Sequence, residues 1–470
     1  MFFGLAAAVL PAYFVVMLSG MVLVPVLLFA WLAGRTTESR DWLLLLMFAG
    51  ILVLPFGWRL TGINLGPVWQ IALMAVSFLG LRRFWAEVEA SIWLKLAVLA
   101  FFLFFVMAIA STMLGHPKWR AVAYQVVSNF KPILLVSFGF ALMWDDRCER
   151  WLSLLLSWAW LPMALMVVFE WVAPGPFHAI GVSAVGMLAT SDPTLFLPSR
   201  AISIFEHPSQ LAAVSASFAM IAYARWLCSA ARTSRQLALV FIYVVLIICA
   251  VQRQELASVM IGLAVIWALF DPKLRGRKIV LLSIATVCVV LVAVVAAPAM
   301  LEDELFKWGI GKIGPIDAPR AQIFIGGFQL ASMHFPFGAG LGTFAGAGAE
   351  KFNFAVYDQL GFGRYWWFGK RGYLLDTYWP NSLGEAGVFG ALFLLLFYLC
   401  LLGFAVAMSR RLVSAQSHAF ALAASGSMIY ILLVSLTSPA FQDPRLFAIP
   451  AMLLGISAHL AKQHAHVEET

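Results

Sequence analysis

The sequence predicts an all-α polytopic membrane protein with about 13–14 transmembrane helices. Of its 470 residues, 63% are hydrophobic and only 11% are charged, with a mean hydropathy of +0.91. Soluble domains carry roughly 25% charged residues. Apolar runs of about 20 residues, the length that crosses a bilayer, recur along the whole chain. Because lipid offers no hydrogen-bond partner to exposed backbone, these runs must be helices, and a soluble globular domain is excluded.

The apolar segments divide the chain into three parts: N-terminal transmembrane helices over 1–299, a long polar loop over 300–380, and C-terminal helices with a short tail over 381–470. The first segment is long enough for one tilted helix or for two short helices, which leaves the count open. We expect spans near 3–34, 41–57, 65–81, 92–114, 121–144, 150–173, 208–228, 236–251, 255–270, 279–299, 382–408, 417–437 and 444–461.

Lysine and arginine concentrate in alternate loops, and the positive-inside rule places those loops in the cytoplasm. They carry Arg35, Arg40, Arg82, Arg83, Arg147, Arg150, Arg232, Arg235, Lys273, Arg275, Arg277, Lys278, Arg410 and Arg411. The opposite loops, 174–207 and 300–380, then face the outside, which in a bacterial inner membrane is the periplasm. These cytoplasmic cations account for most of the net charge of +8, so we expect no nucleic-acid partner.

Several basic residues depart from this pattern, because they lie at the outer side or within a span. Such cations are costly in a membrane and mark functional sites by default. A single arginine can simply extend to lipid headgroups. Several on one side favour an anion site, since the arginine fork of donors suits phosphate. The candidates are Arg120, Lys131, Arg200, Arg253 and Arg320.

Four segments stand out around these cations. Residues 200–212 lead into a helix through Glu206-His207-Pro208, and residues 252–257 place Arg253 and Glu255 at the start of a span. Residues 320–344 run from Arg320 through His334 to a glycine-rich turn. Residues 376–390 run from Asp376 into a long apolar segment.

In this order, the segments resemble the O-antigen ligase and Wzy-type polysaccharide polymerase superfamily, over about residues 200–400. Its pattern has an Arg before a Phe-x-His-Pro-Asn-x-Leu-Ala helix start, an Arg opening a later span, an Arg before a Pro-x-Gly-x-Gly-x-Gly-x-Phe turn, and an Asn-x-x-Leu-x-Glu-x-Gly-x-x-Gly segment. The matching residues are Arg200, Phe205, His207, Pro208, Leu211, Ala212, Arg253, Arg320, Pro336, Gly338, Gly340, Gly342, Phe344, Asn381, Leu383, Glu385, Gly387 and Gly390.

The chain departs from the family at three positions. Ser209 replaces the Asn of the first motif, and Gly384 is an extra glycine in the last. Pro380 stands where the family's ligases carry a His that is thought to act as the catalytic base. Proline cannot exchange a proton, so the sequence favours a polymerase or a ligase that uses another base.

The resemblance implies a GT-C-like membrane glycosyltransferase of the inner membrane with its active site facing the periplasm. The donor would be a glycan on undecaprenyl pyrophosphate, and the acceptor a second lipid-linked repeat unit in O-antigen or exopolysaccharide synthesis. A chain-length-regulating co-polymerase is a further partner that this interpretation allows. We expect no metal or other cofactor, since the sequence has no P-loop, dinucleotide fingerprint or zinc motif.

Within this interpretation, we predict that Arg200, Arg253 and Arg320 bind the pyrophosphate, with Arg120 and Lys131 as weaker candidates. Arg253 would also take part in catalysis. The predicted base is Glu385 or Asp376, with Glu255, His207 and His334 as alternatives; Glu385 could instead be a structural carboxylate paired with an arginine. The predicted sugar contacts are His207, His334, Tyr378, Trp379 and Asn381.

Two other functions remain open from sequence. An O-antigen ligase would transfer the glycan to lipid A core or another acceptor. A transporter of lipid-linked sugars would need a cationic cavity as well, but it would show repeated halves and charges on both sides of that cavity.

Overall fold

A computed structural model describes residues 41–115, 117–179, 200–271, 276–277, 318–368, 373–411 and 414–469. Throughout this part of the chain the regular structure is helical, which confirms the all-α prediction. Nine helices there are long and apolar enough to cross a membrane, at Asp41–Thr61, Ile92–Gly115, Trp119–Ala141, Asp146–Val172, Pro208–Cys228, Arg253–Phe270, Trp379–Ser409, Ala415–Val434 and Pro444–Gln463. The spans expected at 3–34 and 279–299 lie outside the described residues.

Two other expected spans are not among these nine helices. Helix α4 (Gly66–Ser77) has 12 residues and continues through the short turn η2 (Phe78–Gly80) into α5 (Leu81–Ala90). The sequence of α5 alternates charged and apolar residues, so the apolar run stops there. Helix α13 (Ser234–Cys249) has 16 residues, fewer than the roughly 20 that cross a bilayer when upright.

The remaining helices follow the expected order. The first described span comprises α2 (Asp41–Phe48), the π-helical turn η1 (Ala49–Val53) and α3 (Leu54–Thr61). The others are α6 (Ile92–Gly115), α7 (Trp119–Ala141), α8 (Asp146–Trp158), α9 (Trp160–Val172), α10 (Pro174–Ala179), α12 (Pro208–Cys228), α14 (Arg253–Phe270), α17 (Pro319–Met333), α18 (Ala347–Phe352), α19 (Ala355–Gln359), α20 (Trp379–Ser409), α21 (Ala415–Val434) and α22 (Pro444–Glu469).

Helices α12, α21 and α22 form the centre of the bundle. Their most apolar windows are 78%, 83% and 89% buried, against 33% for α6 and 28% for the α8–α9 span. Small residues let the backbones approach, as is common between membrane helices. A Cβ on Gly262 of α14 would lie 3.0 Å from the carbonyl oxygen of Gly426 in α21, and a Cβ on Gly455 of α22 would lie 2.1 Å from the backbone of Gly139 in α7.

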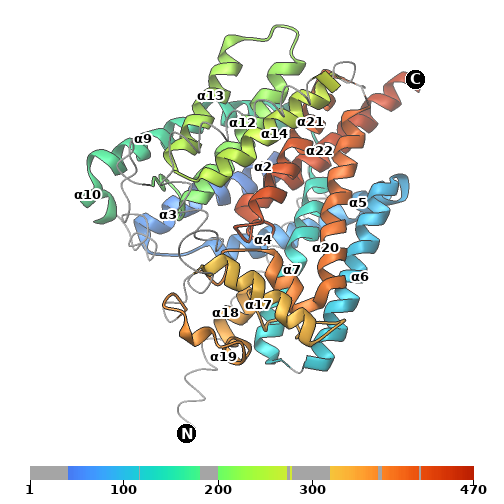
Figure 1. Ribbon diagram of the computed structural model, residues 1–470. Helices are drawn as coiled ribbons and strands as arrows, with labels where there is room; N and C mark the ends of the chain where they lie inside the picture. The colour runs from blue at the N-terminus through green and yellow to red at the C-terminus, as the bar shows by residue number, and fades with distance from the viewer. Residues whose placement is uncertain are drawn as a thin grey trace.

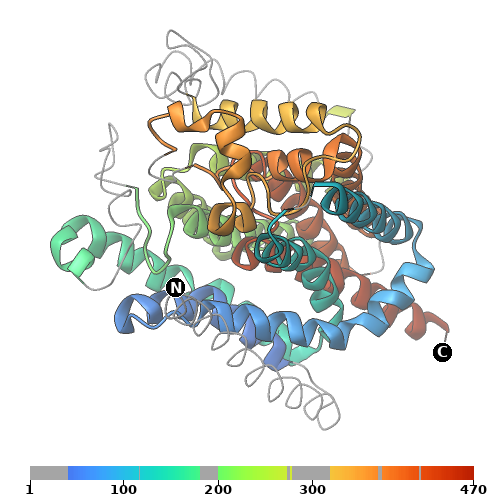
Figure 2. The ribbon, with the colours of Figure 1, turned by 90° about the horizontal axis from the view of Figure 1, so that it is seen from below.

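The two ends of the bundle differ. Helices α17, α18 and α19, from the long polar segment, gather at the end opposite the C-terminus (Figure 1). Seen from that end, α17 lies across the ends of the other helices (Figure 2). We call this the outer end, and the end that holds the C-terminus the inner end, following the sequence-based orientation.

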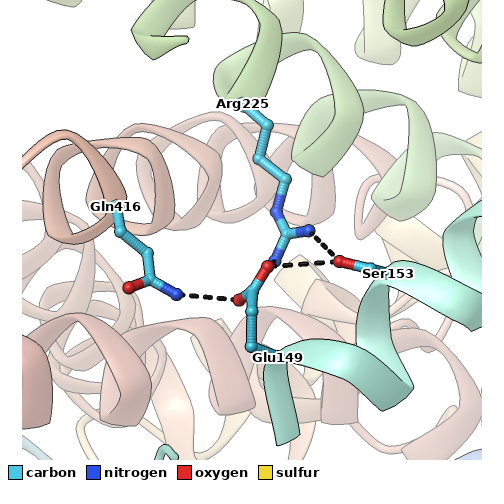
Figure 3. Close-up of polar contacts among 4 residues, drawn as sticks. All are labelled: Glu149, Ser153, Arg225 and Gln416. Carbon is cyan, nitrogen blue, oxygen red and sulfur yellow. Dashed lines mark hydrogen bonds and ion pairs between the residues drawn. The ribbon is translucent and has the colours of Figure 1, made fainter. Parts of the chain in front are cut away.

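A polar network joins three helices at the inner end. Arg225 of α12 forms an ion pair with Glu149 of α8 at 2.8 Å, and it donates a hydrogen bond to Ser153 Oγ at 3.0 Å. Gln416 of α21 donates to the same Glu149 carboxylate at 2.8 Å (Figure 3). The network therefore ties α8 to two of the central helices.

Candidate functional site

Residues 200–207, which we call the strap, cross the outer end just before α12. One buried carboxylate holds the strap: Glu170 Oε2 accepts the backbone N–H groups of Ile202 and Ser203 at 2.9 and 3.0 Å. Arg59 Nη1 donates to the carbonyl oxygen of Ser203 at 2.6 Å. Glu170 and Arg59 are 2% and 7% exposed. The strap backbone is therefore held by two buried side chains of opposite charge, one from α9 and one from α3.

The strap is also fixed at both of its ends. Ala201 N–H donates to the carbonyl oxygen of Cys249 at 3.1 Å, which places the start of the strap beside the turn that leads to Arg253. Near its other end, Glu206 forms an ion pair with Arg445 of α22 at 2.7 Å. His207 then caps α12, because its Nδ1 accepts the backbone N–H of Ser209 at 3.1 Å.

Charged residues from distant parts of the sequence meet beside the strap. The charges of Arg200 and Asp376 both act on the His207 ring, and Arg320 Nε forms an ion pair with Asp376 Oδ2 at 2.7 Å. Within the described residues, Arg200 makes no hydrogen bond and no ion pair of its own. We call Arg200, His207, Arg320 and Asp376 the outer cluster.

His207 in this cluster has a lowered pKa. The residue is exposed, but the surrounding protein desolvates its ring and lowers its pKa from the ordinary value. Arg200 lowers the pKa further, whereas Asp376 and Asp443 act in the opposite direction. A neutral imidazole can accept a proton or donate its N–H to a ligand.

Arg253 begins α14, four residues after Cys249, which accepts the backbone N–H of Ala201 in the strap. It is half-buried, and the following Gln254 donates to the carbonyl oxygen of Leu433 at 3.2 Å. Two residues further along, Ser435 accepts the backbone N–H of Tyr378 at 3.2 Å. The C-terminal end of α21 thus connects the segment of Arg253 to the segment of Asp376.

The glycine-rich turn and the start of α20 interlock around Glu385. Glu385 Oε1 accepts the backbone N–H groups of Thr343 and Phe344 at 3.0 and 3.2 Å. Its side chain is 1% exposed. Gly387 has φ +74°, and a Cβ on Gly338 (φ +84°) would lie 2.5 Å from Gly387 N, so glycine is required at both positions.

These contacts make Glu385 an anchor for the turn. The structural alternative considered from sequence supposed an arginine partner; the hydrogen bonds to Glu385 Oε1 come instead from two backbone N–H groups. Its predicted role as base stays a prediction. Of the two predicted carboxylates, Asp376 is the one in the outer cluster.

Three predicted sugar contacts are engaged within the protein. Tyr378 is 3% exposed and shares a hydrogen bond with the hydroxyl of Tyr398 at 2.8 Å. Asn381 is 4% exposed and donates to the carbonyl oxygen of Phe344 at 2.8 Å. Trp379 is half-buried and donates from Nε1 to Ser435 Oγ at 2.9 Å.

The remaining predicted residues lie at the edge of the cluster or away from it. Lys131 donates to Gln70 Oε1 at 3.0 Å, and the charges of Asp443 and Lys351 act on it. Arg120 is exposed above the Trp119 ring. His334 is exposed beyond the end of α17, about 20 Å along that helix from Arg320.

Sequence reasoning missed the residues that fix the strap, namely Glu170, Arg59, Glu206 and Arg445. Glu170 falls inside an expected span, and a carboxylate there was the available signal. Comparison with models of known protein families and with curated proteins finds no match to this chain. Across the described residues, no group of three His, Cys, Asp or Glu side chains is placed to hold a metal ion.

Proposed function

We propose that this protein is a glycosyltransferase that joins lipid-pyrophosphate-linked glycan repeat units at its outer end, as a polysaccharide polymerase. The observation that carries the proposal is Arg200: a cation with no hydrogen-bond or ion-pair partner in the described residues, beside His207 and the Arg320–Asp376 pair. A cation held at this position needs an anionic partner. The motif order that resembles the polymerase superfamily supplies the identity of that partner.

The reaction is a substitution at the anomeric carbon of the donor sugar. The hydroxyl oxygen of the acceptor glycan forms the new bond to that carbon, and the bond to the pyrophosphate oxygen breaks. The hydroxyl proton passes to a base, and the lipid pyrophosphate leaves with the bonding electrons. Arg200, Arg253 and Arg320 would stabilise the negative charge that develops on the leaving group.

We propose Asp376 as the base in preference to Glu385. Asp376 is half-buried in the outer cluster, and its ion pair with Arg320 orients its carboxylate. Glu385 is enclosed and holds two backbone N–H groups, so its removal would disturb the glycine-rich turn as well as any proton transfer. An Asp376→Asn variant keeps the shape of the side chain and removes its charge.

The direct test is to incubate the purified protein with lipid-linked repeat units and look for a ladder of products on a gel. We expect a ladder from the wild type and from Arg410→Gln, which changes an exposed inner-end arginine. We expect little or no ladder from Arg200→Gln. A full ladder from Arg200→Gln would contradict the proposed site.

A second test separates the polymerase from a ligase. In cells that lack the protein, a polymerase defect leaves single repeat units in place of long polymer. Long chains of normal length that fail to reach their final acceptor would identify a ligase instead. Within the polymerase interpretation, an Asp376→Asn variant with wild-type rate would remove Asp376 as the base.

A further inference from the structure

Helix α5 lies at the inner end and is amphipathic. Phe84 and Val88 are buried, whereas Leu81 and Trp85, on the same apolar side of the helix, are 41% and 55% exposed. An ion pair of 2.6 Å between Glu87 and Lys462 ties this helix to α22. Exposed tryptophan beside arginine on such a helix is typical of a segment at the membrane–water interface.

The side chain of Arg83 in α5 has a polar atom without a hydrogen-bond partner in the described part of the chain. Its side chain is half-buried, and the Nη1 atom is fully buried without any hydrogen-bond partner in the described structure. Burial lowers the pKa of Arg83, and no opposing carboxylate among the described residues raises it. A buried guanidinium N–H without a partner is unfavourable, so an anion that reached Arg83 would stabilise it.

Two further basic groups from α22 lie beside Arg83. The charges of Arg83 and Lys462 both act on His459, and Lys462 is 54% exposed with Glu87 as its ion-pair partner. The three basic side chains come from two helices that are distant in sequence and adjacent at the inner end. Glu87 offsets one charge, which leaves the group with a net positive charge at neutral pH.

We propose that Arg83, His459 and Lys462 form a binding site for a phosphate group at the inner end, independent of the outer cluster. Arg83 and Lys462 supply its positive charge, and an arginine fork binds phosphate oxygens in pairs. The phosphate belongs either to the headgroup of an anionic phospholipid or to a free phosphate ion. The exposed Leu81 and Trp85 on the same helix place acyl chains nearby, which favours the lipid.

The test uses the full chain purified in detergent, with phosphatidylglycerol in one arm and inorganic phosphate in the other. Binding is measured by native mass spectrometry, and stability by thermal unfolding with and without the added anion. Arg83→Gln removes the proposed donors. Arg82→Gln is the matched control, because Arg82 is the neighbouring residue on the same helix, carries the same charge and is exposed.

We expect Arg83→Gln to bind phosphatidylglycerol about tenfold more weakly than the wild type, and Arg82→Gln to bind it equally well. Without added anion, Arg83→Gln should unfold at the same temperature as the wild type or above it, because an unpaired buried charge is gone. Arg83→Lys, which keeps the charge without the fork, should fall between them. It also provides the binding comparison if Arg83→Gln does not fold.

The two arms distinguish the sources of the phosphate. Arg83-dependent binding of phosphatidylglycerol supports the lipid headgroup. Arg83-dependent binding of inorganic phosphate alone supports a free ion at the same site. Equal binding of both anions by the wild type, Arg83→Gln and Arg83→Lys would overturn the proposal, as would a lower unfolding temperature of Arg83→Gln combined with unchanged binding.

Discussion

The two ends of the bundle both carry arginines within or beside a span, but they use them differently. At the inner end, Arg225 of α12 is bonded to Glu149 and Ser153, and Glu149 is bonded in turn to Gln416 (Figure 3). At the outer end, Arg200 makes no hydrogen bond or ion pair in the described residues, although its charge acts on His207.

This contrast separates two uses of a cation in a membrane protein. A paired arginine such as Arg225 holds helices together, and its charge is already offset by Glu149. An unsaturated arginine such as Arg200 contributes little to the fold and is available to an anion. The distinction depends on partners that are far away in sequence, and it leads to opposite expectations for the two residues.

The largest expected effect is on activity, from Arg200→Gln. We expect polymer formation to fall between about 100- and 1000-fold, which is typical of losing one stabiliser of developing charge. The unfolding temperature should stay near that of the wild type. The corresponding variant at the inner end, Arg225→Gln, should lower the unfolding temperature and keep the activity per folded molecule. If the two variants behaved alike, the comparison between the two ends would fail.

The strap gives the next largest effect. Glu170→Ala leaves Arg59 buried without its carboxylate and two strap N–H groups without an acceptor, so we expect a loss of about 3 kcal/mol in the free energy of unfolding. Glu170→Gln keeps an acceptor oxygen and should lose less. Thermal unfolding in detergent measures both variants. Equal stability of wild type and Glu170→Ala would show that the strap is held by other contacts.

The interlocked turn should give a smaller loss. A Cβ on Gly387, at φ +74°, would lie 2.4 Å from the carbonyl oxygen of Pro336. We expect Gly387→Ala to destabilise the protein by about 2 kcal/mol, from backbone strain together with this clash. Gly363→Ala is the control, since a Cβ there meets nothing within 4 Å. The difference between the two unfolding temperatures isolates the effect of the turn.

The smallest effect concerns pH at the start of α12. A lowered pKa for His207 means that the unfolded chain binds the proton more readily than the folded one. The cap on Ser209 is therefore present above about pH 6.5 and is lost as the pH falls. A helix cap contributes about 1 kcal/mol.

His207→Asn supplies a cap that does not titrate. We expect it to match the wild type in thermal unfolding at about pH 7.5 and to exceed it slightly at about pH 5. A stability difference between the two proteins that is the same at both pH values would show that protonation of His207 does not control the cap.

The sequence predicted the membrane class and nine of the spans well, because apolar length is a local property that the bilayer imposes. It overestimated segment 65–81, where the charged residues of α5 follow immediately. It also predicted Tyr378 as a sugar contact, whereas this ring is packed in the core. Composition alone does not distinguish a core ring from an interface ring.

For the candidate site, the sequence predicted that Arg200, Arg320 and Asp376 lie on one side of the membrane, and the structure brings their segments together. It could not predict that Glu170 holds the strap or that Glu385 holds the glycine-rich turn. Both contacts join backbone N–H groups to a carboxylate 32 to 42 residues away in the chain. Such pairings are set by tertiary packing and have no local pattern.

The left-handed Gly387 divides α20 into a short first part and a long second part. In an uninterrupted helix, inserting one residue turns everything beyond it by about 100°. In α20, the residues before the break are fixed by Glu385, so an insertion further along would rotate only the second part within the bundle. The register of this span can therefore change between related proteins while the turn at Glu385 keeps its shape.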